Sequence, residues 1–369
     1  MRAMIDEASR SITNLPEQVA GLDADGRARF ADLFAVTRSG GSLQPPPQMR
    51  AWIERSFGSV EAVQAQTIIK TLNRWTLEGT LFNDLRARRP VARQAPGANA
   101  DAELAGGGDD PFCHPLTGTP ADTFGRIEGT HTITASNVAK YDALHAVILF
   151  KEHNPLTWSG AQVADAFDTA ARWIAAAAAA RPEAVYPFVM WNCRPRSGAS
   201  QVHGHMQATL GEGGAYGRVE LWRRAAEGYR ARHGRDYFAD FYAAHAGLGL
   251  TGRHGDVRWM AHLTPVKEKE LVLLAPAFDG ALAAAVADLL RLLIDTLGVR
   301  AFNVACYLPP LAPVAEDWTD FPVVVRMVDR GDPGSATSDI GAMELFAQPV
   351  VAFDPWKLAG AVREAFPAA

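Results

Sequence analysis

The feature that most constrains the fold is an order of strands and helices that occurs twice along the chain. Residues from about 110 to 215, and again from about 250 to 369, follow the order strand, strand, helix, strand, strand. No exact sequence repeat accompanies this order. We therefore predict an α+β fold made of two related halves.

Alternating and continuous apolar runs predict the strands, and apolar residues spaced three and four apart predict the helices. In the first half we expect strands at His131–Asn137, Ala146–Phe150, Val185–Trp191 and Gln201–Leu210, and a helix at Asp165–Ala180. In the second half we expect strands at Val257–Leu263, Glu270–Leu274, Ala301–Leu308, Val323–Val328 and Glu344–Phe353, and helices at Ala281–Leu297 and Pro355–Phe366.

The first part of the chain has a different pattern. Apolar spacing there predicts helices, for example Met49–Phe57 and Val60–Leu72. The small, polar and glycine-rich stretch Gly97–Asp110 predicts a flexible linker. The expected domains are therefore a helical N-terminal segment with its linker at 1–108, a first half at 109–225 and a second half at 226–369.

Composition excludes several classes of partner. Hydrophobic residues make up 48% and charged residues 21% of the chain, as in ordinary globular proteins. The net charge of −5 argues against nucleic acid and anionic membranes as partners, but not against a single nucleotide. The apolar run Ala281–Val299 carries charged residues and is not expected to span a membrane. Because the three cysteines are too few for a disulfide framework, we expect a cytoplasmic protein.

Polar side chains gather on one face of the predicted strand Gln201–Leu210. Side chains alternate along a strand, so Gln201, His203, His205 and Gln207 are expected to stand in a row, about 6–7 Å apart. Two imidazoles and two amides would then face the same way. The stretch Gln201–Gln207 is the predicted active site.

The loop before this strand has the side chains needed to hold a phosphate. It supplies guanidinium groups, hydroxyls and a glycine-relaxed backbone, all of which bind phosphoryl oxygens. The arginines could equally be solvated loop charges. The residues expected to bind substrate are Asn192, Arg194, Arg196, Ser197, Gly198 and Gln201 in this region, together with Asn137 earlier in the chain, and Ser200 is expected to be catalytic.

Two chemistries remain open for the paired histidines. A neutral imidazole is a competent nucleophile at pH 7, and Gln207 could donate to a phosphoryl oxygen. Alternatively, His203 and His205 could both bind a metal ion, because an H-x-H pair places both rings on one strand face. The phosphate-binding loop and the glutamine favour His205 as a nucleophile.

The segment Ser197–Gln207 resembles the signature of the histidine-triad superfamily, in its transferase branch. That branch includes galactose-1-phosphate uridylyltransferases, diadenosine tetraphosphate phosphorylases (ATP adenylyltransferases) and ADP-sugar phosphorylases. The resemblance implies antiparallel sheets and a covalent nucleotidyl-histidine formed when His205 attacks the α-phosphorus. Gln207 would hold the phosphoryl oxygens. The donor would be a dinucleoside polyphosphate or a nucleotide sugar, and phosphate or a sugar phosphate would accept the nucleotidyl group.

The same resemblance implies a structural zinc site. Related proteins commonly carry C-x-x-C, then an asparagine, here Asn137, and then a strand that ends in a histidine. Mapped onto this chain, the zinc ligands would be Cys113, His153 and His203, with Asp110 in place of the first cysteine. An Asp–Cys–His–His set is chemically acceptable for zinc. The alternative is that Cys113 is an ordinary buried thiol.

Other functions share some of these features. A hydrolase could use the same intermediate with water as acceptor, and a non-catalytic protein could use the motif to hold a nucleotide. No organic cofactor is expected. Because relatives are often dimers, the resemblance also implies a possible homodimer.

Overall fold

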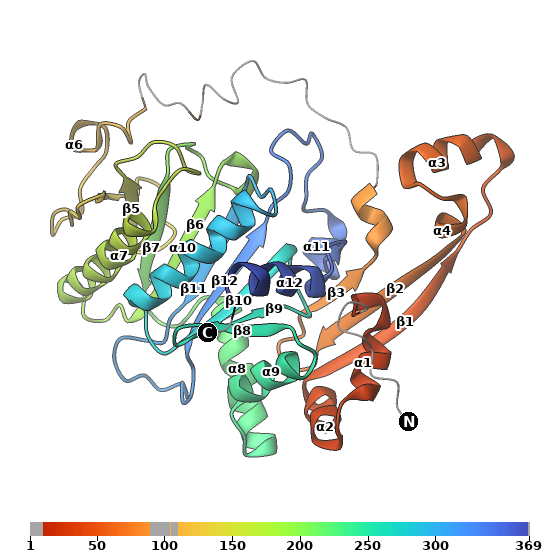
Figure 1. Cartoon of the computed structure of the whole chain (residues 1–369). Helices are drawn as coiled ribbons and strands as arrows, with labels where there is room; N and C mark the ends of the chain where they lie inside the picture. Colours follow the sequence, from red (N-terminus) through yellow and green to blue (C-terminus); the bar gives the residue numbers. More distant parts are fainter. Residues whose placement is uncertain (1–9, 89–103, 105–109, 368–369) are drawn as a thin grey trace.

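The computed structural model describes residues 10–88, 104 and 110–367 and contains two β-sheets. A nine-stranded sheet has the strand order β4-β5-β7-β6-β11-β12-β10-β9-β8, and a four-stranded sheet has the order β1-β2-β3-β13. Helices α7 and α10 lie against the large sheet, and the small sheet lies beside its second half (Figure 1). The α+β class is confirmed.

The strands are β1 (Phe34–Ser42), β2 (Ala65–Asn73), β3 (Gly79–Phe82), β4 (Thr132–Ser136), β5 (Leu144–Phe150), β6 (Tyr186–Cys193), β7 (His205–Gly211), β8 (Thr251–His254), β9 (Val257–Ala261), β10 (Glu268–Ala275), β11 (Phe302–Tyr307), β12 (Val323–Asp329) and β13 (Val350–Val351). The α-helices are α1 (Leu15–Gly21), α2 (Ala24–Leu33), α3 (Arg50–Phe57), α4 (Val60–Gln64), α6 (Pro115–Gly118), α7 (Gly160–Ala180), α8 (Gly217–His233), α9 (Tyr237–Gly247), α10 (Gly280–Asp295), α11 (Ala342–Phe346) and α12 (Pro355–Ala365). Short 3-10 turns are η2 (Ile12–Asn14), η3 (Pro47–Met49), η4 (Asp84–Arg88) and η5 (Pro195–Ser197).

The two predicted halves form one continuous antiparallel sheet. The first half has the order β4-β5-β7-β6 and the second half has the matching order β9-β10-β12-β11. They join where β6 pairs with β11, in a register that places Trp191 opposite Val304. One helix follows the second strand of each half, α7 after β5 and α10 after β10. The predicted duplication is therefore confirmed as a symmetric arrangement around the β6–β11 pair.

Helix α7 illustrates how the sequence sets these elements. Ser159 and Gln162 form a capping box that satisfies free backbone groups at the first turn. Val163, Phe167, Ala170 and other apolar residues follow at helical spacing and are buried. This face covers the sheet on the side from which Ile148 and Met206 point into the main core. Helix α10 packs beside α7 on the same face (Figure 1). Within the described residues, no helix is both long enough and apolar enough to cross a membrane.

The N-terminal segment contains more β-structure than its apolar spacing predicts. Helix α3 confirms the helix expected at Met49–Phe57, but the helix expected at Val60–Leu72 is wrong beyond Gln64. Strand β2 begins at Ala65 because the following run is rich in threonine and isoleucine, and pairing with β1 favours the extended chain. The expected strand Glu344–Phe353 is likewise wrong over most of its length. It contains the end of α11 and only the two-residue strand β13.

The expected boundary between residues 108 and 109 lies outside the described residues. The boundary expected between 225 and 226 falls within α8.

A buried ionic cluster joins the N-terminal sheet to the second half. The Arg326 guanidinium, on β12, donates to Glu270 Oε1 and to Glu78 Oε1, each at 2.6 Å. It also lies over the ring of Trp222, 5.2 Å from the centroid. Burial alone would raise the pKa of Glu270, but Arg326 and His262 hold it at about 2. The Glu270 carboxylate is therefore ionised at neutral pH and needs its cation.

We expect Arg326→Met to lower the free energy of unfolding by about 3–5 kcal/mol, because two buried carboxylates would lose their partner. Urea unfolding monitored by circular dichroism measures the change. The matched control is Glu227→Gln, which removes an ion pair with Arg223 from a carboxylate whose side chain is 47% exposed. That change should cost less than about 1 kcal/mol. Equal effects of the two substitutions would show that the buried cluster does not hold the sheets together.

Candidate active site

The site lies at the start of β7, on the sheet face opposite α7. His205 and Gln207 are the first and third residues of this strand, so both point to that face. The strand begins at His205, and the expectation that it begins at Gln201 is wrong. Residues 201–203 form bends, and Gly204 bonds to the backbone of His153 and of Phe150, the last residue of β5. Gln201 and His203 therefore do not stand in one strand row with His205.

The His205 ring is held in one tautomer. Its Nδ1–H donates to the carbonyl oxygen of His203 at 2.8 Å, so the lone pair of the neutral ring is on Nε2. His205 is only 4% exposed, and burial lowers its pKa. The Phe112 ring packs against it at a steep angle, with ring centroids 5.4 Å apart. An unprotonated nitrogen in a dry site is a suitable nucleophile.

An apolar patch forms the floor beside His205. Ile133, Ala135, Val147 and Leu149 make up a small buried cluster on β4 and β5, and Phe112 packs against it. Strand pairing places Leu149 directly beside His205. The site therefore combines an apolar surface with a few polar groups, which is typical of small-molecule sites.

Gln207 has a partner that the motif does not include. The His145 ring, on β5, lies 2.9 Å from Gln207 Oε1 through its Nε2. His145 is fully buried, and the Asn137 amide also lies beside it, with Nδ2 3.3 Å from the same nitrogen. The structure thus brings Asn137 and Gln207 together around His145. The alternation of side chains along the predicted strand could have placed His145 on this face. A single histidine beside an apolar run, however, does not by itself indicate a functional residue.

The loop between β6 and β7 is fixed by the second half of the protein. Asn192 Oδ1 accepts from the amide of Asn303 at 2.6 Å. The Arg330 guanidinium contacts the Ser197 carbonyl and Asn303 Oδ1. Ser197 Oγ is directed back to the Arg194 carbonyl at 2.8 Å. Residues from both halves therefore hold the predicted phosphate-binding loop.

The remaining loop residues are spread over different surroundings. Arg196 donates to the backbone carbonyls of Arg330 and Thr337, and it lines a cavity of about 900 Å³ with both basic and acidic residues of the second half. Gly198 has φ of 93°, a left-handed conformation that favours glycine. Ser200 is exposed, whereas Gln201 and Arg194 are half-buried. Arg196 therefore lies at this cavity, whereas His205 lies against the Phe112 ring.

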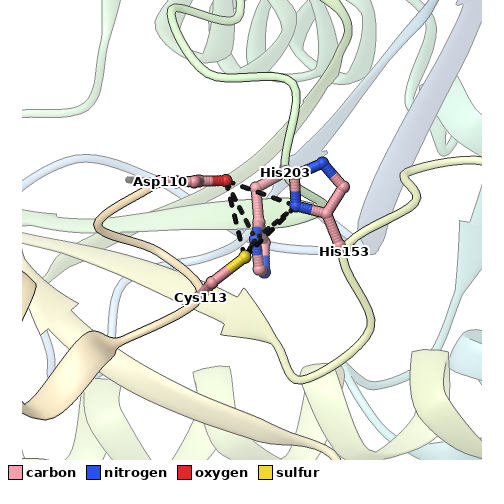
Figure 2. Close-up of side chains that lie close together, drawn as sticks. All are labelled: Asp110, Cys113, His153 and His203. Carbon is pink, nitrogen blue, oxygen red and sulfur yellow. Dashed lines mark hydrogen bonds and ion pairs between the residues drawn. The ribbon is translucent and has the colours of Figure 1, made fainter. Parts of the chain in front are cut away.

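Four side chains from three separate segments meet next to this site (Figure 2). Asp110 and Cys113 come from the turn before α6, His153 follows β5, and His203 precedes β7. His153 Nδ1 and His203 Nδ1 are 3.2 Å apart, and each lies 3.3 Å from Asp110 Oδ2. Cys113 Sγ lies 3.4 Å from His153 Nδ1, 3.5 Å from His203 Nδ1 and 3.8 Å from Asp110 Oδ2.

These six distances describe the edges of a nearly regular tetrahedron. Zinc bonds of about 2.0–2.1 Å to nitrogen and about 2.3 Å to sulfur at tetrahedral angles require edges of about 3.3 Å between nitrogens and about 3.6 Å from sulfur to nitrogen. The observed edges match this requirement. The donor atoms thus fit a four-coordinate zinc ion, and His205 is not one of them.

The orientation of His203 supports the same interpretation. Its Nε2–H donates to the carbonyl oxygen of Phe150 at 2.7 Å, so the unprotonated Nδ1 faces the other three ligands. Its backbone carbonyl accepts from His205. His203 therefore links the four-residue cluster to the proposed nucleophile, which argues against paired metal ligation by both histidines.

The equivalent position in the second half carries no such site. The connection between β11 and β12 corresponds to the one between β6 and β7, and residues 308–322 include no histidine. Of these two connections, only the one in the first half carries a histidine.

Comparison with known proteins identifies the fold. No protein-family model and no curated protein matches this sequence. An ADP-glucose phosphorylase from Arabidopsis thaliana, solved with bound ADP-glucose, superposes with a TM-score of 0.61 at 14% identity, over 79% of this chain and 97% of that one. A GalT-like protein from the same organism gives 0.57 at 14% identity, over 70% of this chain and 93% of that one. A uridylyltransferase gives 0.55 at 14% identity, over 80% of this chain and 97% of that one. The chain therefore shares the fold of these proteins, as the motif led us to expect.

Proposed function

We propose that this protein is a nucleotidyltransferase or phosphorylase that works through a covalent nucleotidyl group on His205. The observation that carries this proposal is the bond from His205 Nδ1–H to the His203 carbonyl, which leaves the Nε2 lone pair free on the strand face that His205 shares with Gln207. The fold shared with an ADP-glucose phosphorylase and a uridylyltransferase supports the same reaction class.

In the first step, the Nε2 lone pair attacks the α-phosphorus of the donor. A nitrogen–phosphorus bond forms, and the bond from that phosphorus to the bridging oxygen breaks. The rest of the donor leaves with that oxygen, as a sugar phosphate from a nucleotide sugar or as a nucleotide from a dinucleoside polyphosphate. The ring becomes cationic in the intermediate, and the His203 carbonyl stabilises its Nδ1–H. The Gln207 amide would bind the oxygens of the transferred group.

In the second step, an oxygen of the acceptor attacks the same phosphorus. The nitrogen–phosphorus bond breaks, and His205 recovers its lone pair. The donor would be a nucleotide sugar or dinucleoside polyphosphate, and the acceptor would be phosphate or a sugar phosphate. The apolar floor formed by Val147 and its neighbours would contact the nucleoside.

Intact-mass measurement tests this proposal. Protein incubated with ADP-glucose, UDP-glucose or diadenosine tetraphosphate, without an acceptor, should gain the mass of one nucleotidyl group. Addition of phosphate or a sugar phosphate should remove it and release the matching product. If no donor gives an adduct or exchanges label with its product, the proposed reaction is wrong. If water alone discharges the adduct as fast as any acceptor, the protein is a hydrolase.

We further propose that Asp110, Cys113, His153 and His203 hold a structural zinc ion. All four ligand positions are filled by protein, so the ion would stabilise the fold and would not bind substrate. Its role for the site would be to fix the backbone of His203, which in turn orients His205.

A further inference from the structure

We propose that His145 is a positioning residue for the transfer reaction, because it fixes the orientation of the Gln207 side-chain amide. This inference rests on the proposed function. It concerns a buried histidine that lies outside the sequence motif and outside the four-residue cluster, on the neighbouring strand β5.

The tautomer of His145 follows from its contacts with Tyr141 and Gln207. The backbone N–H of Tyr141 points at His145 Nδ1 from 3.0 Å, so Nδ1 must be the acceptor. A neutral imidazole has one N–H, which must then be on Nε2. This Nε2–H points at Gln207 Oε1 from 2.9 Å and donates to it. The backbone of an exposed turn therefore determines which atom of Gln207 faces His145.

The consequence concerns the other end of the amide. A glutamine amide can rotate to exchange its oxygen and nitrogen, and the two orientations present opposite polarity to a ligand. Because Oε1 is held by His145, the Nε2 amino group of Gln207 is the part available to a substrate on the His205 side of the strand. Two N–H donors would then meet the negatively charged phosphoryl oxygens. The reversed amide would place a carbonyl oxygen against them.

The Asn137 amide, which lies beside the same ring, also has a fixed orientation. Its Oδ1 accepts from the Ala139 N–H at 3.1 Å, so its amino group is directed towards His145. At 3.3 Å from His145 Nε2, this amino group meets a nitrogen that already carries a hydrogen and cannot accept. The donors of Asn137 and Gln207 are thus both left for a ligand.

The surroundings keep His145 neutral, as this arrangement requires. Burial lowers its pKa, and the nearby Lys140 adds to the effect. The carboxylates of Asp122 and Asp142, which would favour protonation, have other partners. Asp122 accepts from Ser136 Oγ at 2.5 Å, and Asp142 accepts from Tyr216 Oη at 3.0 Å. The Tyr141 ring covers the imidazole, with centroids 4.6 Å apart.

The test compares His145→Phe with His145→Gln in steady-state turnover. Phenylalanine keeps most of the ring volume but cannot donate, so kcat should fall about 10- to 100-fold with little change in KM. Glutamine can donate from its own amide, and it should recover most of that loss. The same kcat in His145→Phe as in the wild type would overturn the inference.

A double-mutant cycle distinguishes positioning from a general structural effect. If His145 acts through Gln207, then His145→Phe should change kcat less than about twofold when Gln207 is already alanine. An equal loss in both backgrounds would overturn the inference. A wild-type protein that forms no adduct would instead overturn the proposed function, so the two failures are distinguishable.

The tautomer can also be tested without changing the buried ring. Tyr141→Pro removes the backbone N–H that donates a hydrogen bond to His145 Nδ1, whereas Tyr141→Ala removes the side chain and keeps that N–H. The proline variant should lower kcat more than the alanine variant does. The reverse order would contradict the proposed role of the backbone. This pair of variants remains informative if His145→Phe does not fold.

Discussion

Replacing His205 with asparagine is expected to abolish the nucleotidyl adduct and to lower turnover by about 10⁴-fold or more. The asparagine amide can still donate to the His203 carbonyl in place of Nδ1, but it offers no nitrogen lone pair for attack on phosphorus. The variant thus removes the nucleophile and keeps the local hydrogen bond. Intact mass after incubation with donor, and the rate with donor and acceptor, measure the two effects.

The matched control for this change is His254→Asn. His254 is a half-buried histidine on β8 whose Nε2 contacts Asp288 at 2.8 Å, on the far edge of the large sheet. This control should form the adduct at the wild-type rate. If His205→Asn formed the adduct at the same site as the wild type, His205 would not be the nucleophile.

Gln207→Ala should have a different signature. It removes amide donors and leaves the His205 nucleophile in place, so adduct formation should be slower by about 10²- to 10³-fold but should still reach completion. Adduct yield therefore separates the residue that forms the bond from the residue that stabilises the transferred group.

The symmetric core could be predicted from the sequence because each element had its own local signal. Helix α7, for example, combines a capping box with apolar residues at helical spacing, so both its start and its buried face can be predicted locally. Strand β2 shows the opposite case. Its residues fit a helical apolar pattern as well as an alternating one, and pairing with β1 decides between them.

The site was only partly predictable for a related reason. The motif residues His205 and Gln207 are close in sequence, so alternation sufficed to place them on one face. His145 and the donors around it become neighbours of Gln207 only when β5 pairs with β7. The positions of Asp110, Cys113, His153 and His203 in the sequence also do not predict that their side chains form a tetrahedron. These side chains come together only when the whole first half has folded. The four ligands were predicted from the resemblance to known proteins, not from their spacing.

Cys113→Ser is expected to remove bound zinc and to destabilise the protein. The wild type should contain about one zinc ion per chain, and a thousandfold excess of zinc over its dissociation constant would stabilise the fold by about 4 kcal/mol. Elemental analysis measures the zinc, and thermal unfolding with and without a chelator measures the stabilisation. The control Cys306→Ala changes a buried thiol on β11, outside the cluster, and should leave the zinc content unchanged.

Substitutions of Asp110 can test the zinc site in both directions, by weakening or by strengthening zinc binding. Asp110→Ala leaves three protein ligands and should weaken zinc binding, whereas Asp110→Cys supplies a second thiolate and should slow release to a chelator. Because the His203 carbonyl holds the His205 ring, zinc loss should lower adduct formation together with stability. If the wild type bound no zinc, and the chelator changed neither its unfolding temperature nor its adduct yield, hydrogen bonds alone would hold the four side chains together.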